Sequence, residues 1–406
     1  MFKRKFTHYA SNSRGLPGRP SRVGGGRRGA RGGRGGTGLN PSLLVHKASQ
    51  ATAAEVDTFR PSFEFKDLPV HPQLKANILK KGYTTPTPIQ EGTILHINEG
   101  RDVLGIANTG TGKTAAFLIP FINAALGDPN ERVLILVPTR EIAIQIQDEF
   151  VGFTHGTRLL SVVCVGGLPI IRQIRSLKMG PVCVIATPGR LKDLLARNAI
   201  SLSRCKRVIL DEADRMVDMG FIKDIKMILG LLPKERQSLF FSATLPNDVK
   251  DLIHSFLHDP VTVSVKKQET AENVDQDIVE VMPSQNKLSV LIGLLKKENF
   301  QKVLIFLRTK RGVDRLFGSL KDAGFSVACI HGDKEQGHRT RALDAFKSNR
   351  IQILVATDVA ARGLDIPNVS HVINFDMPQT YEDYIHRIGR TGRMDKKGHA
   401  LTFVER

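Results

Sequence analysis

Short apolar runs recur along the chain, and the segments between them have the spacing of helices. These runs are apolar throughout instead of alternating, which is typical of strands buried on both faces of a parallel sheet. Helical patterns such as REIAIQIQDEF and GFIKDIKMILGLL separate them. The rhythm predicts an open, doubly wound α/β fold. The first seven runs are VLGIA, RVLILVPT, LSVVCVGG, PVCVIATP, KRVILDEAD, SLFFSATL and VTVSV.

A polar stretch, VKKQETAENVDQD at 265–277, interrupts this rhythm. The rhythm then resumes with KVLIFLRT, SVACIHG, IQILVATD, HVINFDMP and HALTFVE. We therefore predict two parallel-sheet α/β domains, residues 61–267 and 278–406, with a linker over 268–277. Two similar domains joined by a hinge would form a cleft between them, which is a common location for a functional site.

The first 60 residues have a different composition. They hold twelve Lys and Arg against two acids, so they contribute +10 of the chain's net charge of +19. The stretch RGLPGRPSRVGGGRRGARGGRGGTG has too few apolar side chains to offset its ordering entropy. We predict a disordered, basic Gly/Arg-rich tail over residues 1–60. Such charge indicates a polyanionic partner, above all nucleic acid, although a merely solubilising tail is the alternative.

Cysteine usage and the N-terminal composition bear on localisation. The four cysteines show no C-x-x-C spacing, and three lie in apolar runs, which favours small core residues over zinc ligands or disulfides. No apolar run reaches the length of a membrane span, and the N-terminus has no signal-peptide core. These features predict a cytoplasmic protein. Residues 1–54 lack acids, as organellar transit peptides do, but eleven glycines within 14–38 oppose the amphipathic helix of such a peptide.

The segment ANTGTGKT, residues 107–114, directly follows the expected strand VLGIA. Glycines at 110 and 112 would let backbone N–H groups turn inward and hold phosphate oxygens at a helix N-terminus. Lys113 would reach the terminal phosphates, and the Thr114 hydroxyl suits Mg²⁺. Ala107 stands where the strict pattern has glycine. The strand-loop-helix context favours a phosphate loop over a Gly-rich turn without function.

A pair of acids, Asp211 and Glu212, follows the apolar run KRVIL. They would lie at the carboxyl edge of a buried strand, where ligands bind in such sheets. Alone, two adjacent acids would be an ordinary solvated strand end. Together with the phosphate loop, Asp211 is placed to hold Mg²⁺ and Glu212 to polarise an attacking water. The residues therefore predict hydrolysis of Mg-ATP.

A candidate for base recognition lies in GYTTPTPIQ, residues 82–90. The Gln90 side chain could pair with the N6/N7 edge of adenine. Phe65, seventeen residues before Gly82, could stack on the base. The alternative is that this segment is an ordinary Pro-rich turn whose glutamine lies at the surface and binds no base.

Over residues 62–406 the chain resembles the DEAD-box RNA helicases. The motifs that carry the resemblance stand in order: Phe65 with GYTTPTPIQ, ANTGTGKT, PTREIAIQ (138–145), GG (166–167), TPGR (187–190), DEAD (211–214), SAT (242–244), LIFLRTK (304–310), HGDKEQGHR (331–339), ATDVAARGLDI (356–366) and HRIGRTGR (386–393).

The resemblance implies two RecA-like domains that close on ATP, Mg²⁺ and a single RNA strand. The residues it implies for nucleotide binding are Phe65, Gln90, Ala107, Asn108, Thr109, Gly110, Thr111, Gly112, Lys113, Thr114 and Asp365. Those implied for RNA contact are Pro138, Thr139, Arg140, Gly167, Thr187, Gly189, Arg190, Thr309, Asp333, Gln336, Arg339 and Thr357. Those implied for coupling hydrolysis to strand separation are Asp214, Ser242, Thr244 and His386. The expected activity is separation of short RNA duplexes or remodelling of RNA–protein complexes.

HRIGRTGR packs three arginines and a histidine into eight residues, which is costly unless an anion lies nearby. We expect that anion to be the terminal phosphate of ATP bound to the other domain. Arg390 and Arg393 would then act as arginine fingers, and together with Lys113, Asp211 and Glu212 they form the expected catalytic set. The alternative is a solvated basic helix end.

Other functions share parts of this pattern. A DNA translocase could use the same two-domain ATPase, because the family reads the sugar-phosphate backbone and the preference for RNA rests on 2′-OH contacts. A non-catalytic RNA clamp would need a damaged site, yet Lys113, Glu212 and both arginines are present. A GTPase is disfavoured, since no guanine-reading motif accompanies the phosphate loop.

Overall fold

The computed structural model describes residues 59–108, 110–265, 274–297, 300–361, 366, 369–392 and 397–405. Almost all of the predicted tail and most of the predicted linker lie outside these residues. So do three predicted site residues: Thr109, Asp365 and Arg393.

Both predicted α/β folds are present. In the first, seven described strands run parallel in the order β3-β4-β2-β5-β6-β1-β7. Every apolar run named for this part of the sequence contains all or nearly all of one of them, and β2, which lies inside the sheet, is buried along its whole length. The strands are β1 (Val103–Ile106), β2 (Val133–Leu136), β3 (Ser161–Cys164), β4 (Cys183–Ala186), β5 (Arg207–Leu210), β6 (Gln237–Ser242) and β7 (Val261–Ser264).

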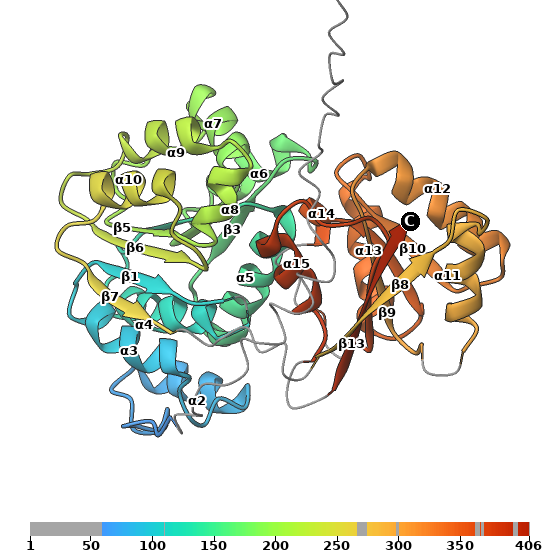
Figure 1. Ribbon diagram of the computed structural model, residues 1–406. Helices are drawn as coiled ribbons and strands as arrows, with labels where there is room; N and C mark the ends of the chain where they lie inside the picture. The colour runs from blue at the N-terminus through green and yellow to red at the C-terminus, as the bar shows by residue number, and fades with distance from the viewer. Residues whose placement is uncertain are drawn as a thin grey trace, which may run out of the picture. The chain divides into compact units, whose positions relative to one another are not determined.

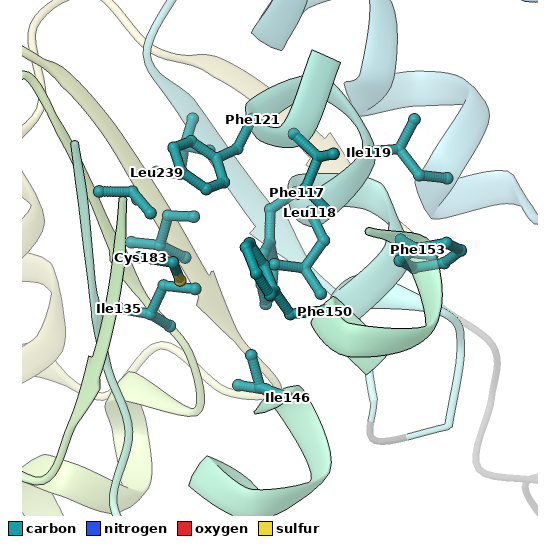
Figure 2. Close-up of a cluster of buried hydrophobic side chains, with 14 of the residues drawn as sticks. Phe117, Leu118, Ile119, Phe121, Ile135, Ile146, Phe150, Phe153, Cys183 and Leu239 are labelled. Carbon is teal, nitrogen blue, oxygen red and sulfur yellow. The ribbon is translucent and has the colours of Figure 1, made fainter. Parts of the chain in front are cut away.

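Helices cover both faces of this sheet (Figure 1). One face packs against α3, α4 and α5, and the other against α7, α8, α9 and α10. Figure 2 shows the first core, where phenylalanines of α4 and α5 meet side chains of β2, β4 and β6. The helices are α2 (Pro72–Lys80), α3 (Pro88–Asn98), α4 (Lys113–Gly127), α5 (Arg140–Phe153), α6 (Ile170–Leu177), α7 (Pro188–Ala196), α8 (Ala213–Asp218), α9 (Ile222–Leu229) and α10 (Asn247–Phe256).

The second sheet has six described strands, all parallel, in the order β10-β11-β9-β12-β13-β8. Side chains of α11 and α12 join the core on one face, and those of α13 and α14 join the core on the other. The strands are β8 (Val274–Val281), β9 (Val303–Leu307), β10 (Val327–Ile330), β11 (Ile353–Thr357), β12 (His371–Asn374) and β13 (Gly398–Glu405). The helices are α11 (Lys287–Leu295), α12 (Lys310–Asp322), α13 (Gln336–Lys347), α14 (Asp358–Ala361) and α15 (Tyr381–Ile388).

The end of the predicted linker is wrong. Residues 274–277 were expected to connect the domains, but they are the first four residues of β8, which pairs along its length with β13. This strand lies at the edge of the sheet, and Asp275, Gln276, Asp277 and Glu280 interrupt its apolar residues. It therefore lacks the continuous apolar run that marked the other strands.

The cysteines are core residues, as predicted. All four are free and buried. Burial raises the pKa of the Cys164 thiol to about 12, so the thiolate is disfavoured at neutral pH. Within the described ranges, no helix is both long and apolar enough to cross a membrane.

Candidate nucleotide and RNA site

The phosphate loop lies at the carboxyl edge of the first sheet. It follows β1 and ends where α4 begins at Lys113. Gly112 has φ 93°, and a Cβ atom there would lie 2.4 Å from the Gln90 amide nitrogen, so only glycine fits. The buried Lys113 ammonium donates to the Ala107 carbonyl at 2.9 Å and lies 3.9 Å from Asp211 Oδ1. The loop thus holds a cation where terminal phosphates would bind.

Gln90 connects helix α3 to the phosphate loop. Its Oε1 accepts from the Thr87 N–H at 2.8 Å, and its Nε2 donates to the Gly112 carbonyl at 3.1 Å. The Thr87 hydroxyl donates to the Thr111 carbonyl at 2.7 Å. Gln90 is only 1% exposed, so the alternative of an ordinary surface glutamine is wrong. Each end of the amide keeps capacity for one more hydrogen bond, which adenine would need.

Phe65 does not offer a ring face to a base. It is wholly buried and packs edge-on against Tyr83, with ring centroids 5.8 Å apart. The ring belongs to the core beneath α3 and α4. The expected stacking on adenine is therefore not supported by the position of this side chain.

Asp211 and Glu212 follow β5 at the same sheet edge. Glu212 has left-handed backbone angles, φ 51° and ψ 51°, which are uncommon for a residue with a side chain and cost about 1–3 kcal/mol. Such strain is concentrated at functional sites. Asp211 Oδ1 accepts from the Glu212 N–H at 3.0 Å, and Arg215 forms a hydrogen-bonded ion pair with the Glu212 carboxylate. The strained turn and Arg215 together fix the direction of the Glu212 side chain.

The two acids differ in proton affinity although both are buried. Burial raises the pKa of Asp211 to about 6, against the opposing charge of Lys113. Burial also works to raise the pKa of Glu212, but the cations Arg215, Lys113 and Arg390 outweigh it and lower that pKa to about 2. Glu212 is thus ionised at neutral pH, as a residue that orients a water must be.

Asp214 joins the DEAD segment to the SAT segment. Its Oδ2 accepts from the Thr244 N–H and the Thr244 hydroxyl, both at 2.9 Å, and from the Ala243 N–H at 3.2 Å. The Ser242 hydroxyl donates to the Thr244 carbonyl at 2.7 Å. A shift of α8 would therefore move the end of β6 with it.

Helix α15 and the turn that follows it carry two of the arginines of HRIGRTGR, Arg387 and Arg390. Arg390 is buried, its Nε donates to the His386 carbonyl at 3.3 Å, and its charge reaches Glu212 of the first sheet. Arg387 turns inward instead, where its Nε and Nη2 contact the two oxygens of Asp358 at 2.5 and 2.7 Å. Arg390 thus lies near the acid, while Arg387 anchors the helix.

Three residues predicted to contact RNA cluster beside the loop after β3. Arg140, the first residue of α5, lies against Gly167. A Cβ atom at position 167 would be only 2.0 Å from Nη1 of Arg140. Gly167 also has φ 76°, so both the positive φ and the close approach of Arg140 require glycine here. Arg190 Nη1 donates to the Leu168 carbonyl at 3.0 Å. Burial lowers the pKa of Arg140, and the neighbouring charges of Arg339 and Arg190 lower it further.

Residues from the second sheet join this cluster. Gln336 Oε1 accepts from Arg140 at 3.4 Å, and its Nε2 donates to Glu141 at 3.2 Å. Arg339 forms an ion pair with Glu141 at 2.9 Å. Side chains from α5 and α13 are thereby brought together at the position predicted for the RNA backbone.

The other predicted RNA residues stand at helix starts and strand ends. Thr139 and Thr309 accept from the N–H groups of Ile142 and Gly312 and so cap α5 and α12. Backbone N–H groups at such starts can bind phosphate. Asp333 forms an ion pair with Lys310, with Nζ and Oδ1 2.5 Å apart. Of the remainder, Pro138 precedes the α5 cap, Thr187 and Gly189 lie at the start of α7, and Thr357 ends β11.

Sequence reasoning missed two buried partners of predicted residues. Arg215 could have been found, because it stands three residues after Glu212 at a helix start. Glu141 gave no such signal, since its partner Gln336 is 195 residues away along the chain.

Comparisons with known proteins agree with this geometry. Residues 87–252 match the family model of the DEAD/DEAH box helicases, and residues 286–395 match the helicase conserved C-terminal domain. The ATP-dependent RNA helicase CshA of Limosilactobacillus reuteri is 45% identical over 343 residues, which cover 84% of this chain and 69% of that protein. The chain belongs to the DEAD/DEAH box helicase family.

Solved structures of the family share its architecture. The structure of S. cerevisiae Dbp5 bound to RNA and ADP BeF3 has a TM-score of 0.74 and 31% identity, over 84% of this chain and 89% of Dbp5. That of the DEAD-box helicase Mss116 bound to ssRNA and UDP-BeF has a TM-score of 0.77 and 30% identity, over 86% and 77% of the two chains.

Proposed function

We propose that this member of the family is an ATP-dependent RNA helicase, which binds single-stranded RNA and hydrolyses ATP to separate short duplexes or remodel RNA–protein complexes. The observation that carries the proposal is the meeting of both sheets at two places. The charge of Arg390 acts on Glu212 and helps to lower its pKa, and Gln336 with Arg339 contacts Arg140 and Glu141 beside the loop after β3. Closure of the two domains on each other would therefore complete the ATP site and the RNA site together.

The residues predicted for the nucleotide site, apart from Phe65, then have these roles. Gln90 reads adenine, the loop 107–114 and Lys113 hold the phosphates, and Glu212 polarises the attacking water. Arg390 and Arg393 stabilise charge on the transferred phosphoryl group. Asp365 contacts the ribose. The domains are those of the sequence analysis, with the linker ending before Val274. Because its cysteines are free and buried, we place the protein in the cytoplasm.

Mg²⁺ fits the residues present. The described residues contain no group of three His, Cys, Asp or Glu side chains that could hold a metal. Mg²⁺ commonly keeps several waters and binds through one or two protein oxygens and the substrate phosphates. Thr114 and the buried Asp211 would supply those oxygens, and the ion would neutralise phosphate charge. Chelation with EDTA should therefore abolish ATP turnover.

A comparison of polymers tests the proposal against its main rival. We expect ATP turnover to rise with single-stranded RNA and to stay near its basal rate with single-stranded DNA of the same sequence. Glu212→Gln should abolish turnover while ATP and RNA binding persist, because only water activation is lost. Equal stimulation by DNA would indicate a translocase, and ATP-dependent RNA binding without hydrolysis in the unaltered protein would indicate a clamp.

A further inference from the structure

The sequence on both sides of the GG loop is basic and lacks acids over a long stretch. From residue 151 to residue 192 the chain has six Lys and Arg and no Asp or Glu. Three of the cations, Arg172, Arg175 and Lys178, belong to α6 and its C-cap, and all three side chains are exposed. None of these three forms an ion pair with any residue that the structure describes. Their charge is therefore available to an external anion.

Helix geometry keeps this charge on one side. Ile170, Ile174 and Leu177 pack against the core formed with α7 to α10. Since successive residues turn by about 100°, positions 172 and 175 point away from those three, and Lys178 at the C-cap lies at the border of the same basic face. The three cations span about 9 Å along the helix axis at 1.5 Å per residue. Consecutive phosphates of a strand lie about 3.4 Å apart along the axis of a helical duplex and farther apart in an extended single strand, so this span faces two phosphates or, where the strand stays helical, three.

The basic face continues directly from the candidate RNA site. Helix α6 begins three residues after Gly167, whose loop is held by Arg140 and Arg190. A hollow of about 380 Å³ lies beside it, lined in part by Leu168, Pro169, Arg172 and Ser176. Unpaired bases can turn into such apolar hollows, whereas bases within a duplex cannot. The charge and the hollow together suit a single strand more than a second protein.

We infer that α6 is an accessory binding surface for the single-stranded RNA that leaves the core site past the GG loop. This α6 track, defined by Arg172, Arg175 and Lys178, contacts phosphates and carries no part of the hydrolysis. The inference rests on the proposed function, because it needs RNA in the core site. It predicts that RNA long enough to reach α6 binds more tightly and with a steeper salt dependence than RNA that fills only the core site.

The test uses the full chain with Arg172→Gln, Arg175→Gln and Lys178→Gln combined. Binding of fluorescent oligouridylates of about 4 to about 16 nucleotides is measured by anisotropy across a range of salt. Each phosphate contact contributes about 0.7 to the slope of log affinity against log salt for a single strand. We expect the slope for long RNA to fall by about 1.5 to 2, so that the loss of affinity is about tenfold larger at 50 mM than at 200 mM salt.

A matched control removes the same charge elsewhere on the same domain. Lys223→Gln, Lys226→Gln and Lys234→Gln change three exposed lysines on and after α9. This control should bind RNA of every length like the unaltered protein. Short RNA should bind the α6 variant normally and should stimulate its ATPase fully, which separates failure of the track from failure of the proposed function. The inference is overturned if the two triple variants behave alike on long RNA, or if the α6 variant loses short RNA equally.

Discussion

The Arg387 side chain offers a direct test of how the arginine helix α15 is anchored. Its side chain is 2% exposed, and its guanidinium lies over the Phe306 ring, at 5.2 Å from the centroid. Besides the two contacts with Asp358, Nη1 donates to the Asp376 carbonyl at 2.7 Å and to Asn374 Oδ1 at 3.2 Å. Arg387→Met keeps much of the apolar stem but removes every one of these donors.

The expected cost follows from what is left behind. Breaking one side of a buried ion pair costs about 3–5 kcal/mol, because the remaining charge loses its partner. Asp358 is 21% exposed, so we expect the lower end of this range. For a domain of this size about 1 kcal/mol corresponds to roughly 3–5 °C in Tm, so we expect a fall of about 10–20 °C. Arg387→Met with Asp358→Leu should recover most of the loss, since exchanging a whole buried pair for apolar residues is often nearly neutral.

Thermal unfolding followed by circular dichroism, without nucleotide, measures both variants. Arg311→Met, an exposed arginine on α12, is the matched control and should change the free energy of unfolding by less than about 0.5 kcal/mol. The reasoning is refuted if Arg387→Met costs less than about 1 kcal/mol, or if the double variant is no more stable than the single one. In either case Arg387 would not be the anchor of α15.

Three further outcomes are expected. Deleting residues 1–60 should weaken RNA binding and flatten its salt dependence while saturated ATP turnover stays constant; unchanged binding at low salt would leave only a solubilising role. Arg390→Lys should lower RNA-stimulated turnover well over tenfold with little loss of ATP affinity, since an arginine finger contributes about 10³–10⁵ and lysine lacks its fork; a smaller loss would remove Arg390 from the role of an arginine finger. Burial lowers the pKa of His371 to about 4, and the charge of His399 adds to this. The unfolded chain then binds the proton first, so stability should fall by about 1–2 kcal/mol, allowing for partial solvent screening, as pH drops from 6.5 to 4. His371→Phe should reduce that fall in Tm scans, and an identical pH profile would remove His371 as its cause.

The fold could be predicted where strands are buried on both faces, because burial makes the whole run apolar. Each apolar run that we named for the two sheets contains all or nearly all of a strand. Strand β8 was missed because it lies at a sheet edge, where the charged residues Asp275, Asp277 and Glu280 are exposed to solvent. Edge strands are often charged in this way, which hides them from a search for apolar runs.

Spacing along the sequence located Lys113, Asp211 and Glu212, because the phosphate loop and strand end are local features. It could not locate Glu141 beside Arg339, which depends on packing between residues far apart in the chain. Phe65 shows the opposite failure. Its position in the sequence suggested a base contact, yet its ring fills the core, and only the packing decides between these roles.

The strand order explains how one sheet edge can serve two ligands. In the first sheet, the segments predicted to contact RNA follow β3, β4 and β2, which are neighbours, while the nucleotide and coupling segments follow β5, β6 and β1. The second sheet repeats the division, with the segments predicted for RNA at β10, β11 and β9, and α15 after β12. The two halves meet where β2 pairs with β5, and the Asp211 N–H donates to the Leu136 carbonyl at 3.0 Å. Because that strand pair is rigid, we expect the ends of both strands to move as one body. RNA bound after β2 would then set the position of Asp211 and Glu212 after β5, without any contact between RNA and ATP.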